Sequence, residues 1–307
     1  MDVVKSIHDL IGKTPLLEIT SFPLPNDVRL FAKLEYLNPG GSVKDRLGQT
    51  LLREAVGSGQ LKEGGTIIEP TAGNTGIGLA LAALGKGYRV MFVVPERFSE
   101  EKQTLMKALG AEIVHTPTEK GMKGAIAKAN ELLESIPDAY SPRQFENPAN
   151  PKAYYETLGP EIWQQTDGGV THFIAGAGTG GTFMGTTQFL KEQNSAIKAT
   201  IVEPEGSILN GGPEHSHKTE GIGMEFLPGY MIPAMFDSIR TISDEDAFRR
   251  VKELASLEGC LVGSSSGAAL HAALLEAETA PRGSQLVTLF PDGSERYLSK
   301  KIYEGGL

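Results

Sequence analysis

The stretch that decides the fold runs from residue 171 to residue 183 and reads THFIAGAGTGGTF. Its first part is a short apolar run of the kind that forms a buried parallel strand. A glycine-rich turn follows, and a helical pattern begins at Phe183. Such a turn directs backbone N–H groups and a helix N-terminus at one point, which makes a ready site for a phosphate. We therefore expect a strand, a phosphate-binding turn and a helix in succession.

The same alternation of apolar strand and helix extends over the rest of the chain. Strands that are apolar throughout and alternate with helices indicate a parallel sheet covered on both faces. The sequence therefore predicts an α/β fold. The expected strands are residues 28–35, 66–69, 89–94, 112–115, 172–175, 200–203 and 286–290, and the expected helices include 77–84, 100–109, 124–134, 183–191 and 245–257.

Composition restricts the class of protein and its partners. The chain has 307 residues, enough for one large or two ordinary domains, and a net charge of −9, which argues against nucleic acid or an anionic membrane as the main partner. No stretch is long and apolar enough to cross a bilayer, and the N-terminus shows no leader pattern. The single cysteine, Cys260, excludes an internal disulfide, and its apolar neighbours predict a buried core residue. We expect a cytoplasmic globular protein.

A lysine stands where a helix is expected to begin. Residues 38–46, NPGGSVKDR, follow a predicted strand, and Ser42 can cap a helix that starts near Lys44. Ligands of open α/β sheets bind beyond the carboxyl ends of strands. A positive charge is disfavoured at a helix N-terminus, so this position favours the neutral amine that imine chemistry requires. An exposed loop lysine is the alternative, and position alone leaves both open.

A second glycine-containing turn spans residues 69–76, EPTAGNTG, again between a predicted strand and a predicted helix. It offers backbone N–H groups, two hydroxyls and one amide, and no strong base. Donors of this kind suit a carboxylate. The two turns together indicate one site for a phosphate and one for the carboxylate of an amino acid.

Two other kinds of site compete for these residues. Gly176, Gly178 and Gly181 satisfy G-x-G-x-x-G, and Glu203 ends the next predicted strand, as in a dinucleotide-binding fold. The additional Thr-Gly-Gly-Thr suits a terminal monophosphate better than a buried pyrophosphate. His215 and His217 lie in a polar loop without further ligands nearby, so no metal site is predicted.

Four motifs, NPGGSVKDR, PTAGNTG, GTGGT and SSSGAA, occur in this order and resemble those of the cysteine synthase and cystathionine β-synthase family of fold-type-II pyridoxal-phosphate enzymes. The resemblance runs from about residue 7 to about residue 298. It implies two doubly wound α/β domains, similar to the tryptophan synthase β-subunit, with pyridoxal 5'-phosphate in the cleft. It further implies a smaller domain over residues 40–147 and a larger domain made of residues 1–39 and 148–307.

The resemblance also assigns roles to individual residues. Lys44 matches the lysine that bonds the cofactor covalently, Asn74 the amide at the ring hydroxyl, and Ser265 the residue at the pyridine nitrogen. A neutral hydroxyl there does not keep the ring protonated, which suits prompt β-elimination over transamination; the same serine could also cap a helix. The phosphate cup is matched by Gly178, Thr179, Gly180, Gly181 and Thr182, and the surroundings of the substrate carboxylate by Thr71, Ala72, Thr75 and Gln144.

The sequence departs from cysteine synthases at two places. Ala72 replaces their usual serine, and residues 220–226, EGIGMEF, carry Glu220 and Glu225 where cysteine synthases have small residues. The second segment is more similar to cystathionine β-synthases, and an acidic side chain there could receive the ammonium of homocysteine.

These features predict replacement of the β-substituent of O-acetylserine or serine by a thiol. Homocysteine, giving cystathionine, is favoured, and sulfide, giving cysteine, is the alternative. A serine or threonine dehydratase and a non-catalytic nucleotide-binding sensor are further alternatives. The resemblance alone implies a homodimer and possible binding to a serine acetyltransferase.

Overall fold

The computed structural model describes residues 3–304, and these form two compact units. The first unit holds residues 3–11 and Asn38–Asn150, and the second holds Gly12–Leu37 and residues 151–304. The domains expected from sequence, 40–147 and the remainder, differ from these units at the N-terminus. Residues 3–11 pack with the first unit because His8 Nε2 forms a 2.8 Å hydrogen bond with the carbonyl oxygen of Leu81. The boundaries of the folding domains stay a prediction.

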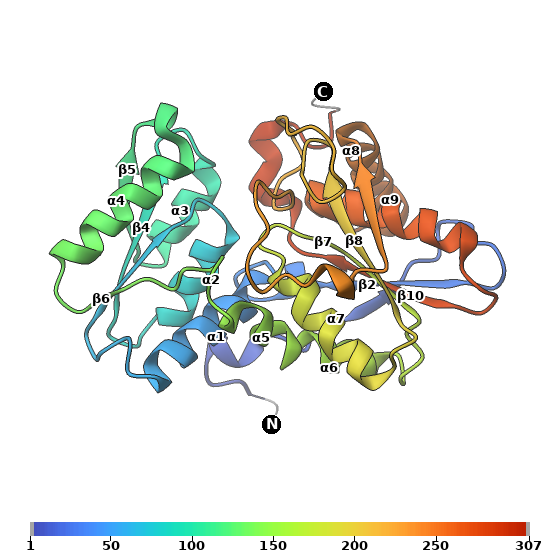
Figure 1. Ribbon diagram of the computed structural model, residues 1–307, viewed down its shortest axis with the longest axis horizontal. Coiled ribbons are helices and arrows are strands. Elements are labelled where there is room, and N and C mark those ends of the chain that lie inside the picture. The colour runs from blue at the N-terminus through green and yellow to red at the C-terminus, as the bar shows by residue number, and fades with distance from the viewer. Residues whose placement is uncertain (1–2, 305–307) are drawn as a thin grey trace. The chain divides into compact units, whose positions relative to one another are not determined.

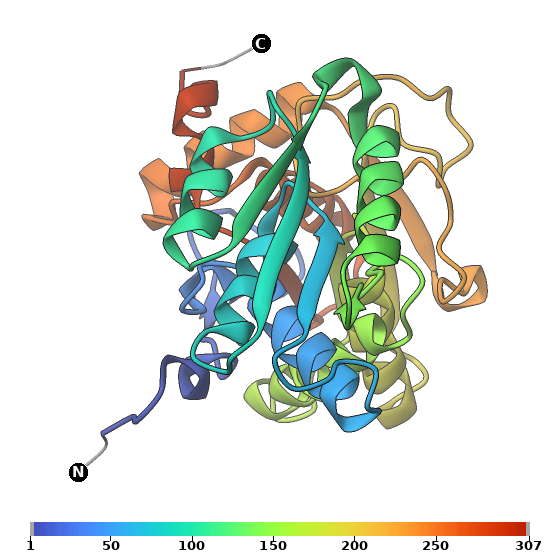
Figure 2. The same cartoon turned by 90° about the vertical axis from the view of Figure 1, so that its left-hand side faces the viewer.

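The first unit is a parallel sheet of strand order β5-β4-β3-β6 with helices on both faces (Figures 1 and 2). Helix α4 covers one face, where Ile68, Met91 and Val93 pack against Ala125 and Ala129. The elements in chain order are the 3₁₀ helix Ile7–Leu10, α1 (Lys44–Gly57), β3 (Thr66–Pro70), α2 (Asn74–Ala83), β4 (Arg89–Pro95), α3 (Glu100–Ala108), β5 (Glu112–Thr116), the 3₁₀ helix Thr118–Lys120, α4 (Gly121–Ser135) and β6 (Ala139–Tyr140).

The second unit is a six-stranded sheet of order β1-β2-β10-β7-β8-β9, in which β1 runs antiparallel to β2 and the other neighbours are parallel. Its elements are β1 (Leu16–Glu18), β2 (Arg29–Leu34), the 3₁₀ helix Glu35–Leu37, α6 (Leu158–Gln165), β7 (His172–Gly176), α7 (Gly181–Gln193), β8 (Lys198–Pro204), the 3₁₀ helix Pro233–Met235, β9 (Ser238–Ile242), α8 (Asp244–Glu253), the π-helix Leu254–Glu258, α9 (Ser264–Thr279), β10 (Gln285–Phe290) and the 3₁₀ helix Ser294–Lys300. Helix α5 (Ala149–Tyr155) lies where the chain passes from the first unit to the second.

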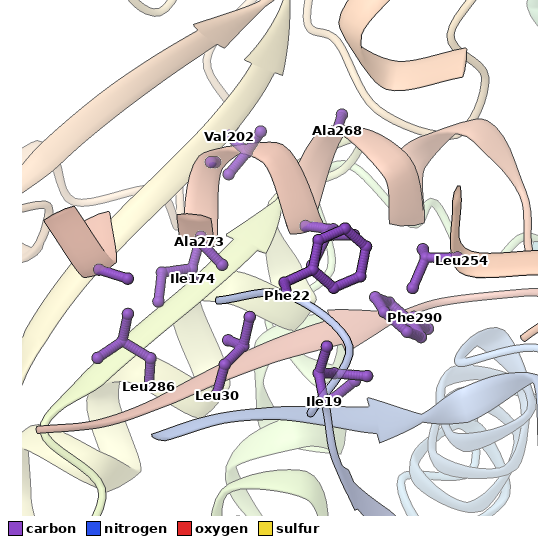
Figure 3. Packing of buried hydrophobic residues seen from close by; sticks show 14 of the residues in the cluster. Ile19, Phe22, Leu30, Ile174, Val202, Leu254, Ala268, Ala273, Leu286 and Phe290 are labelled. Atoms are coloured by element: carbon purple, nitrogen blue, oxygen red, sulfur yellow. The ribbon is translucent and has the colours of Figure 1, made fainter. Parts of the chain in front are cut away.

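The core of the second unit lies between this sheet and α9. Leu30, Ile174 and Leu286, from three neighbouring strands, contribute to one buried cluster with Ala273 of α9 and Phe22 (Figure 3). Helices α8 and α9 lie on one side of the sheet and α6 and α7 on the other (Figure 1). This two-layered covering explains why the parallel strands are apolar along their whole length.

The predicted α/β class is confirmed, and each of the seven expected strands is present within two residues of its expected ends. The helix expected over residues 245–257 is α-helical only to Glu253, after which the chain forms a π-helix. Cys260 is 2% exposed and belongs to the core, as predicted, and burial raises the pKa of its thiol. Within residues 3–304 we find no helix with the length and apolar character that a membrane span requires.

Candidate active site

Lys44 is the first residue of α1 and is partly buried. The expected cap needs a correction, because the residue that precedes the helix is Val43, which has no capping side chain. Ser42 still contributes, since its Oγ accepts a 3.2 Å hydrogen bond from the backbone N–H of Lys44. The buried carboxylate of Asp45 accepts a 2.5 Å bond from the N–H of Gly40, which ties the preceding loop to the helix. These hydrogen bonds hold the backbone at Lys44 in a fixed position.

Asn74 is the first residue of α2, so the start of a second helix lies in the same unit. The two helices pack at very short range through glycines. A Cβ at Gly78 would overlap the carbonyl oxygen of Lys44, and a Cβ at Gly48 would overlap the carbonyl oxygen of Gly78. The absence of side chains at these positions thus brings the first turn of α1 against α2. Lys44 and Asn74, thirty positions apart in the sequence, belong to one packed pair of helices.

The expected carboxylate-binding residues also come together within the first unit. The hydroxyl of Thr75 donates a 2.7 Å hydrogen bond to Oε1 of Gln144, and both residues are buried. Thr71 Oγ1 accepts a long, 3.5 Å bond from the N–H of Gly73, and Ala72 between them is 6% exposed. Gln144 comes from a loop far along the chain, so the fold assembles a cluster of hydroxyl and amide groups that sequence spacing does not show.

The phosphate-binding turn predicted from Gly176 to Thr182 lies in the second unit, between β7 and α7. Gly180 precedes the helix with φ 83°, a left-handed conformation that favours glycine, and it provides no capping side chain. The first intrahelical bond there runs from the N–H of Met184 to the carbonyl of Gly180. The preceding N–H groups of the first turn thus have no acceptor within the helix, which is the arrangement that binds anions.

The same turn is a cradle that has no room for side chains. A Cβ at Gly178 would overlap the carbonyl oxygen of Gly221, and a Cβ at Gly176 would lie 2.5 Å from Cγ2 of Ile222. Thr179 belongs to the turn and Thr182 to the first turn of the helix, and both residues are buried. Backbone N–H groups, two hydroxyls and a helix N-terminus form a donor set that fits a monophosphate, so the residues present fit the phosphate of pyridoxal phosphate.

Ser265 is the second residue of α9 and is buried. The helix-cap role considered for it is wrong, because Gly263 is the capping residue and Ser265 lies inside the first turn. Its neighbour Ser264 accepts a 3.0 Å bond from the N–H of Glu220, which connects the segment 220–226 to the start of α9. These residues all belong to the second unit.

The two glutamates of the segment 220–226 have different surroundings. The carboxylate of Glu220 forms an ion pair with Lys300, so it already interacts with a cation. Glu225 is exposed, whereas its neighbour Met224 is buried and donates a 2.9 Å bond from its N–H to Ser207 Oγ. Of the two, Glu225 is therefore the more accessible to a ligand from solvent.

The competing dinucleotide-binding hypothesis requires that Glu203 contact a ribose. That residue is fully buried, and its carboxylate accepts bonds from the N–H groups of Leu209 and Asn210 at 2.8 and 2.9 Å and from the Thr241 hydroxyl at 3.0 Å. Both carboxylate oxygens hold the loop that follows β8. Glu203 thus has a structural function in place of the ribose contact that the alternative hypothesis requires.

The histidines of the polar loop bind backbone oxygens. His215 Nδ1 lies 3.1 Å from the carbonyl of Ser216, and His217 Nδ1 lies 2.8 Å from the carbonyl of Thr219. Among residues 3–304, no three histidine, cysteine, aspartate or glutamate side chains are grouped as a metal site would require.

Sequence reasoning missed Glu69, a carboxylate that is 2% exposed. Its three hydrogen bonds go to the loop that carries Gln144. A signal was present in the sequence, because a glutamate directly after Ile67 and Ile68 in an apolar strand is expected to be buried and to need partners.

Comparison with known proteins connects this geometry to a family. The family model described as "Pyridoxal-phosphate dependent enzyme" matches residues 7–292. The chain belongs to this family. Its members depend on pyridoxal phosphate, so that cofactor, expected from the four motifs, is confirmed.

Several relatives of the family cover this chain from end to end. It is 60% identical over 307 residues, 100% of both chains, to the O-acetylserine dependent cystathionine beta-synthase of Bacillus subtilis. It is 55% identical over 305 residues, 99% of this chain and 100% of the other, to a cysteine synthase of Helicobacter pylori. The crystal structure of O-acetylserine dependent cystathionine beta-synthase from Helicobacter pylori matches with a TM-score of 0.95 at 55% identity, and covers 99% of this chain and 100% of that one. The fold of the family is therefore confirmed for this chain.

Proposed function

We propose that this enzyme replaces the β-substituent of O-acetylserine, or of serine, with a thiol. The observation that carries the proposal is the packing of α1 on α2, which holds Lys44 beside the helix that begins at Asn74. The full-length similarity to proteins named for O-acetylserine dependent cystathionine synthesis and for cysteine synthesis supports it.

From the resemblance, we expect Lys44 to bond the cofactor covalently and Asn74 to donate a hydrogen bond to its ring hydroxyl. Its phosphate would be bound by Gly178, Thr179, Gly180, Gly181 and Thr182, and Ser265 would lie at its pyridine nitrogen. When bound, pyridoxal phosphate withdraws electrons from the α-carbon of an amino acid, which makes the α-proton acidic and allows the β-substituent to leave.

Lys44 would move the proton. Its Nζ would take the α-proton of the bound amino acid and return it to the α-carbon after the thiol has added. The N-terminus of α1 disfavours the ammonium form, so the neutral base is favoured during the first transfer. Ser265 contributes a hydroxyl in place of a carboxylate, and the ring nitrogen is therefore not kept protonated.

The carboxylate of the amino-acid donor would bind to the cluster made by Thr71, Thr75 and Gln144. The Thr71 hydroxyl, Nε2 of Gln144 and the backbone N–H of Thr75 in the first turn of α2 supply hydrogen-bond donors, while the Thr75 hydroxyl donates to Oε1 of Gln144 and orients that amide. Ala72 offers its backbone N–H where a serine would add a further donor. These groups hold the α-carbon in place while the proton moves.

We propose homocysteine as the thiol, with cystathionine as the product. The segment 220–226 supports it through Glu225, whose exposed carboxylate can attract the ammonium group of an amino-acid thiol. Glu220 can take this role only by leaving Lys300. Sulfide remains the second candidate, because the cysteine synthase of Helicobacter pylori is also 55% identical to this chain.

The assembly and location belong to the same proposal. We expect a homodimer, and binding to a serine acetyltransferase, from the resemblance to the cysteine synthases. The lone cysteine, Cys260, supports a reducing compartment such as the cytoplasm.

The test is turnover of O-acetylserine by the purified enzyme with either thiol, with products identified by mass spectrometry. Lys44→Ala should lower turnover by at least about a thousandfold while the thermal melting temperature stays close to that of the wild type, because a catalytic base and covalent anchor are lost. Lys86→Ala, an exposed lysine of the same unit, is the matched control and should be fully active. Full activity of Lys44→Ala would refute the proposed role. A strong preference for sulfide would assign the second function, and a keto acid without a thiol product would indicate a dehydratase.

A further inference from the structure

Glu69 lies on β3, two positions before the expected carboxylate-binding residue Thr71. It is 2% exposed and lies in a strand that pairs with β4 on one side and β6 on the other. Burial of a carboxylate is costly unless hydrogen bonds compensate for the lost water. Burial raises the pKa of the Glu69 carboxyl, and the hydrogen bonds from residues 141–144 oppose that shift.

The partners of the Glu69 carboxylate all come from one short loop. Oε2 accepts a 3.0 Å bond from the Ser141 hydroxyl and a 3.1 Å bond from the N–H of Arg143, and Oε1 accepts a 3.2 Å bond from the N–H of Gln144. An ionised carboxylate has only acceptors, so it can satisfy three donors at once. A glutamine would instead present its NH₂ group to at least one of these donors.

The loop of residues 141–144, fixed in this way, places Gln144 at the expected carboxylate site. Gln144 accepts the 2.7 Å bond from Thr75 through its side chain, and its backbone carbonyl accepts a 2.8 Å bond from Nδ2 of Asn150. Its backbone N–H is the group bonded to Glu69. The position of the Gln144 side chain relative to α2 therefore depends on the Glu69 carboxylate.

We propose that Glu69 is a positioning residue that holds Gln144 against Thr75, so that both can bind the carboxylate of the amino-acid substrate. This role rests on the proposed function of the enzyme. Glu69 acts through the backbone of residues 143–144 and does not itself touch the substrate. A displaced Gln144 weakens the binding of the amino acid more than it slows the chemistry of a molecule that is already bound.

The test is Glu69→Gln in the holoenzyme, with steady-state kinetics at varied O-acetylserine. We expect KM for O-acetylserine to rise at least about tenfold, because the amide N–H of the glutamine then faces a donor of the loop and one hydrogen bond is lost. We expect kcat at saturation to fall less than about threefold, and KM for the thiol to stay unchanged. An equal loss in kcat and an unchanged KM would overturn the positioning role.

Two further variants separate positioning from a general loss of structure. Glu112→Gln makes the same change at an exposed glutamate on β5, which pairs with Arg89, and it should leave both kinetic constants unchanged. Ser141→Ala removes one donor and leaves the carboxylate and the two backbone donors in place. It should raise KM by about threefold, a smaller effect, since only one neutral donor is lost. If Glu69→Gln fails to fold, the threefold KM increase in Ser141→Ala supports the proposal, and an unchanged KM there refutes it.

A binding measurement does not depend on turnover. The dissociation constant of L-serine, followed by the change in cofactor absorbance, should rise in Glu69→Gln by about the same factor as KM. Amide hydrogen exchange of peptides that cover residues 141–147 should become faster in this variant and stay unchanged in Glu112→Gln. If the wild type binds L-serine but turns over no thiol, the proposed function fails while the positioning role is still decided by these constants. An unchanged L-serine dissociation constant overturns the positioning role, even if exchange of the loop becomes faster.

Discussion

His172 is a buried histidine on β7, the strand that leads to the phosphate-binding turn. Its Nδ1 lies 2.9 Å from the hydroxyl of Thr171. Burial lowers the pKa of the imidazole, and the carboxylates of Glu276 and Asp237 only partly oppose that shift. Folding therefore favours the neutral ring.

The first prediction concerns the pH dependence of stability. Because the pKa of His172 is lower in the folded state than in the unfolded state, the unfolded chain binds more protons below about pH 6.5, and stability falls as the pH decreases through that range. His172→Gln removes the contribution of this histidine to the pH dependence of the unfolding free energy. The difference in unfolding free energy between wild type and variant should shrink by up to about 1 kcal/mol between about pH 8 and pH 5.5.

Urea unfolding at several pH values measures this difference. His115→Gln removes an exposed imidazole and is the matched control, for which the difference from wild type should not follow the same trend. A difference that stays constant over the whole range for His172→Gln would show that this histidine does not contribute to the pH dependence.

Contacts between residues that are distant in the sequence could not be predicted from the sequence. The strand and turn around residues 171–183 are local, and their alternation of apolar strand and glycine turn is visible in the sequence alone. The bonds from Glu69 to the loop 141–144, the ion pair of Glu220 with Lys300, and the use of Glu203 by residues 209–210 all depend on the folded arrangement. Motifs identify which residue types are present, whereas the fold decides which of their atoms already have partners.

At the scale of elements, the pairing of α1 with α2 is the main determinant of the first half of the site. Gly48 and Gly78 allow the two backbones to meet. Gly78→Ala should place its Cβ on the carbonyl oxygen of Lys44 and push the helices apart, at a cost of about 1–3 kcal/mol in unfolding free energy. We also expect a lower cofactor content, because Lys44 would be displaced.

Thermal melting and cofactor absorbance measure these two effects. Gly57→Ala lies on α1, the helix that packs against α2, and no atom lies within 4 Å of its added Cβ. This control should keep its cofactor and be as stable as the wild type or more stable by about 0.5 kcal/mol, since alanine is the better helix former. Equal stability and cofactor content in Gly78→Ala would show that the helices can separate without consequence.

Elements differ in how well their sequence predicts them. The buried central strands were predictable because they are continuous apolar runs. The strands β1, β6 and β9 lie at sheet edges and are short or partly exposed. Their sequences contain no continuous apolar run that would predict them. Helices α5 and α6 each contain a proline, Pro151 and Pro160, which masks the helical pattern. The π-helical end of α8 comes from packing and has no local signature.

At the scale of the whole molecule, the order of the chain differs from the order of its units. Strands β1 and β2 of the second unit precede the whole of the first unit's sheet, and β2 pairs in parallel with β10 near the other end of the chain. Composition and periodicity give the α/β class, but they carry no information on this pairing between distant segments. The resemblance of four motifs to a known family supplied the two-domain expectation.

The net charge of −9 is also a property of the whole molecule, and it distinguishes the two candidate thiols. At about pH 8 sulfide is mostly an anion, whereas homocysteine is close to a neutral zwitterion. A negative surface potential lowers the local concentration of anions, and added salt screens it over a Debye length of about 10 Å at 0.1 M. Raising the salt from about 20 mM to about 200 mM should therefore increase kcat/KM for sulfide by about twofold and leave kcat/KM for homocysteine nearly unchanged.

Steady-state rates with each thiol at saturating O-acetylserine measure this effect, with a neutral osmolyte as the control for solvent changes. A decrease of kcat/KM for sulfide with salt would mean that a local positive field outweighs the charge of the molecule, and sulfide would then become the better supported acceptor.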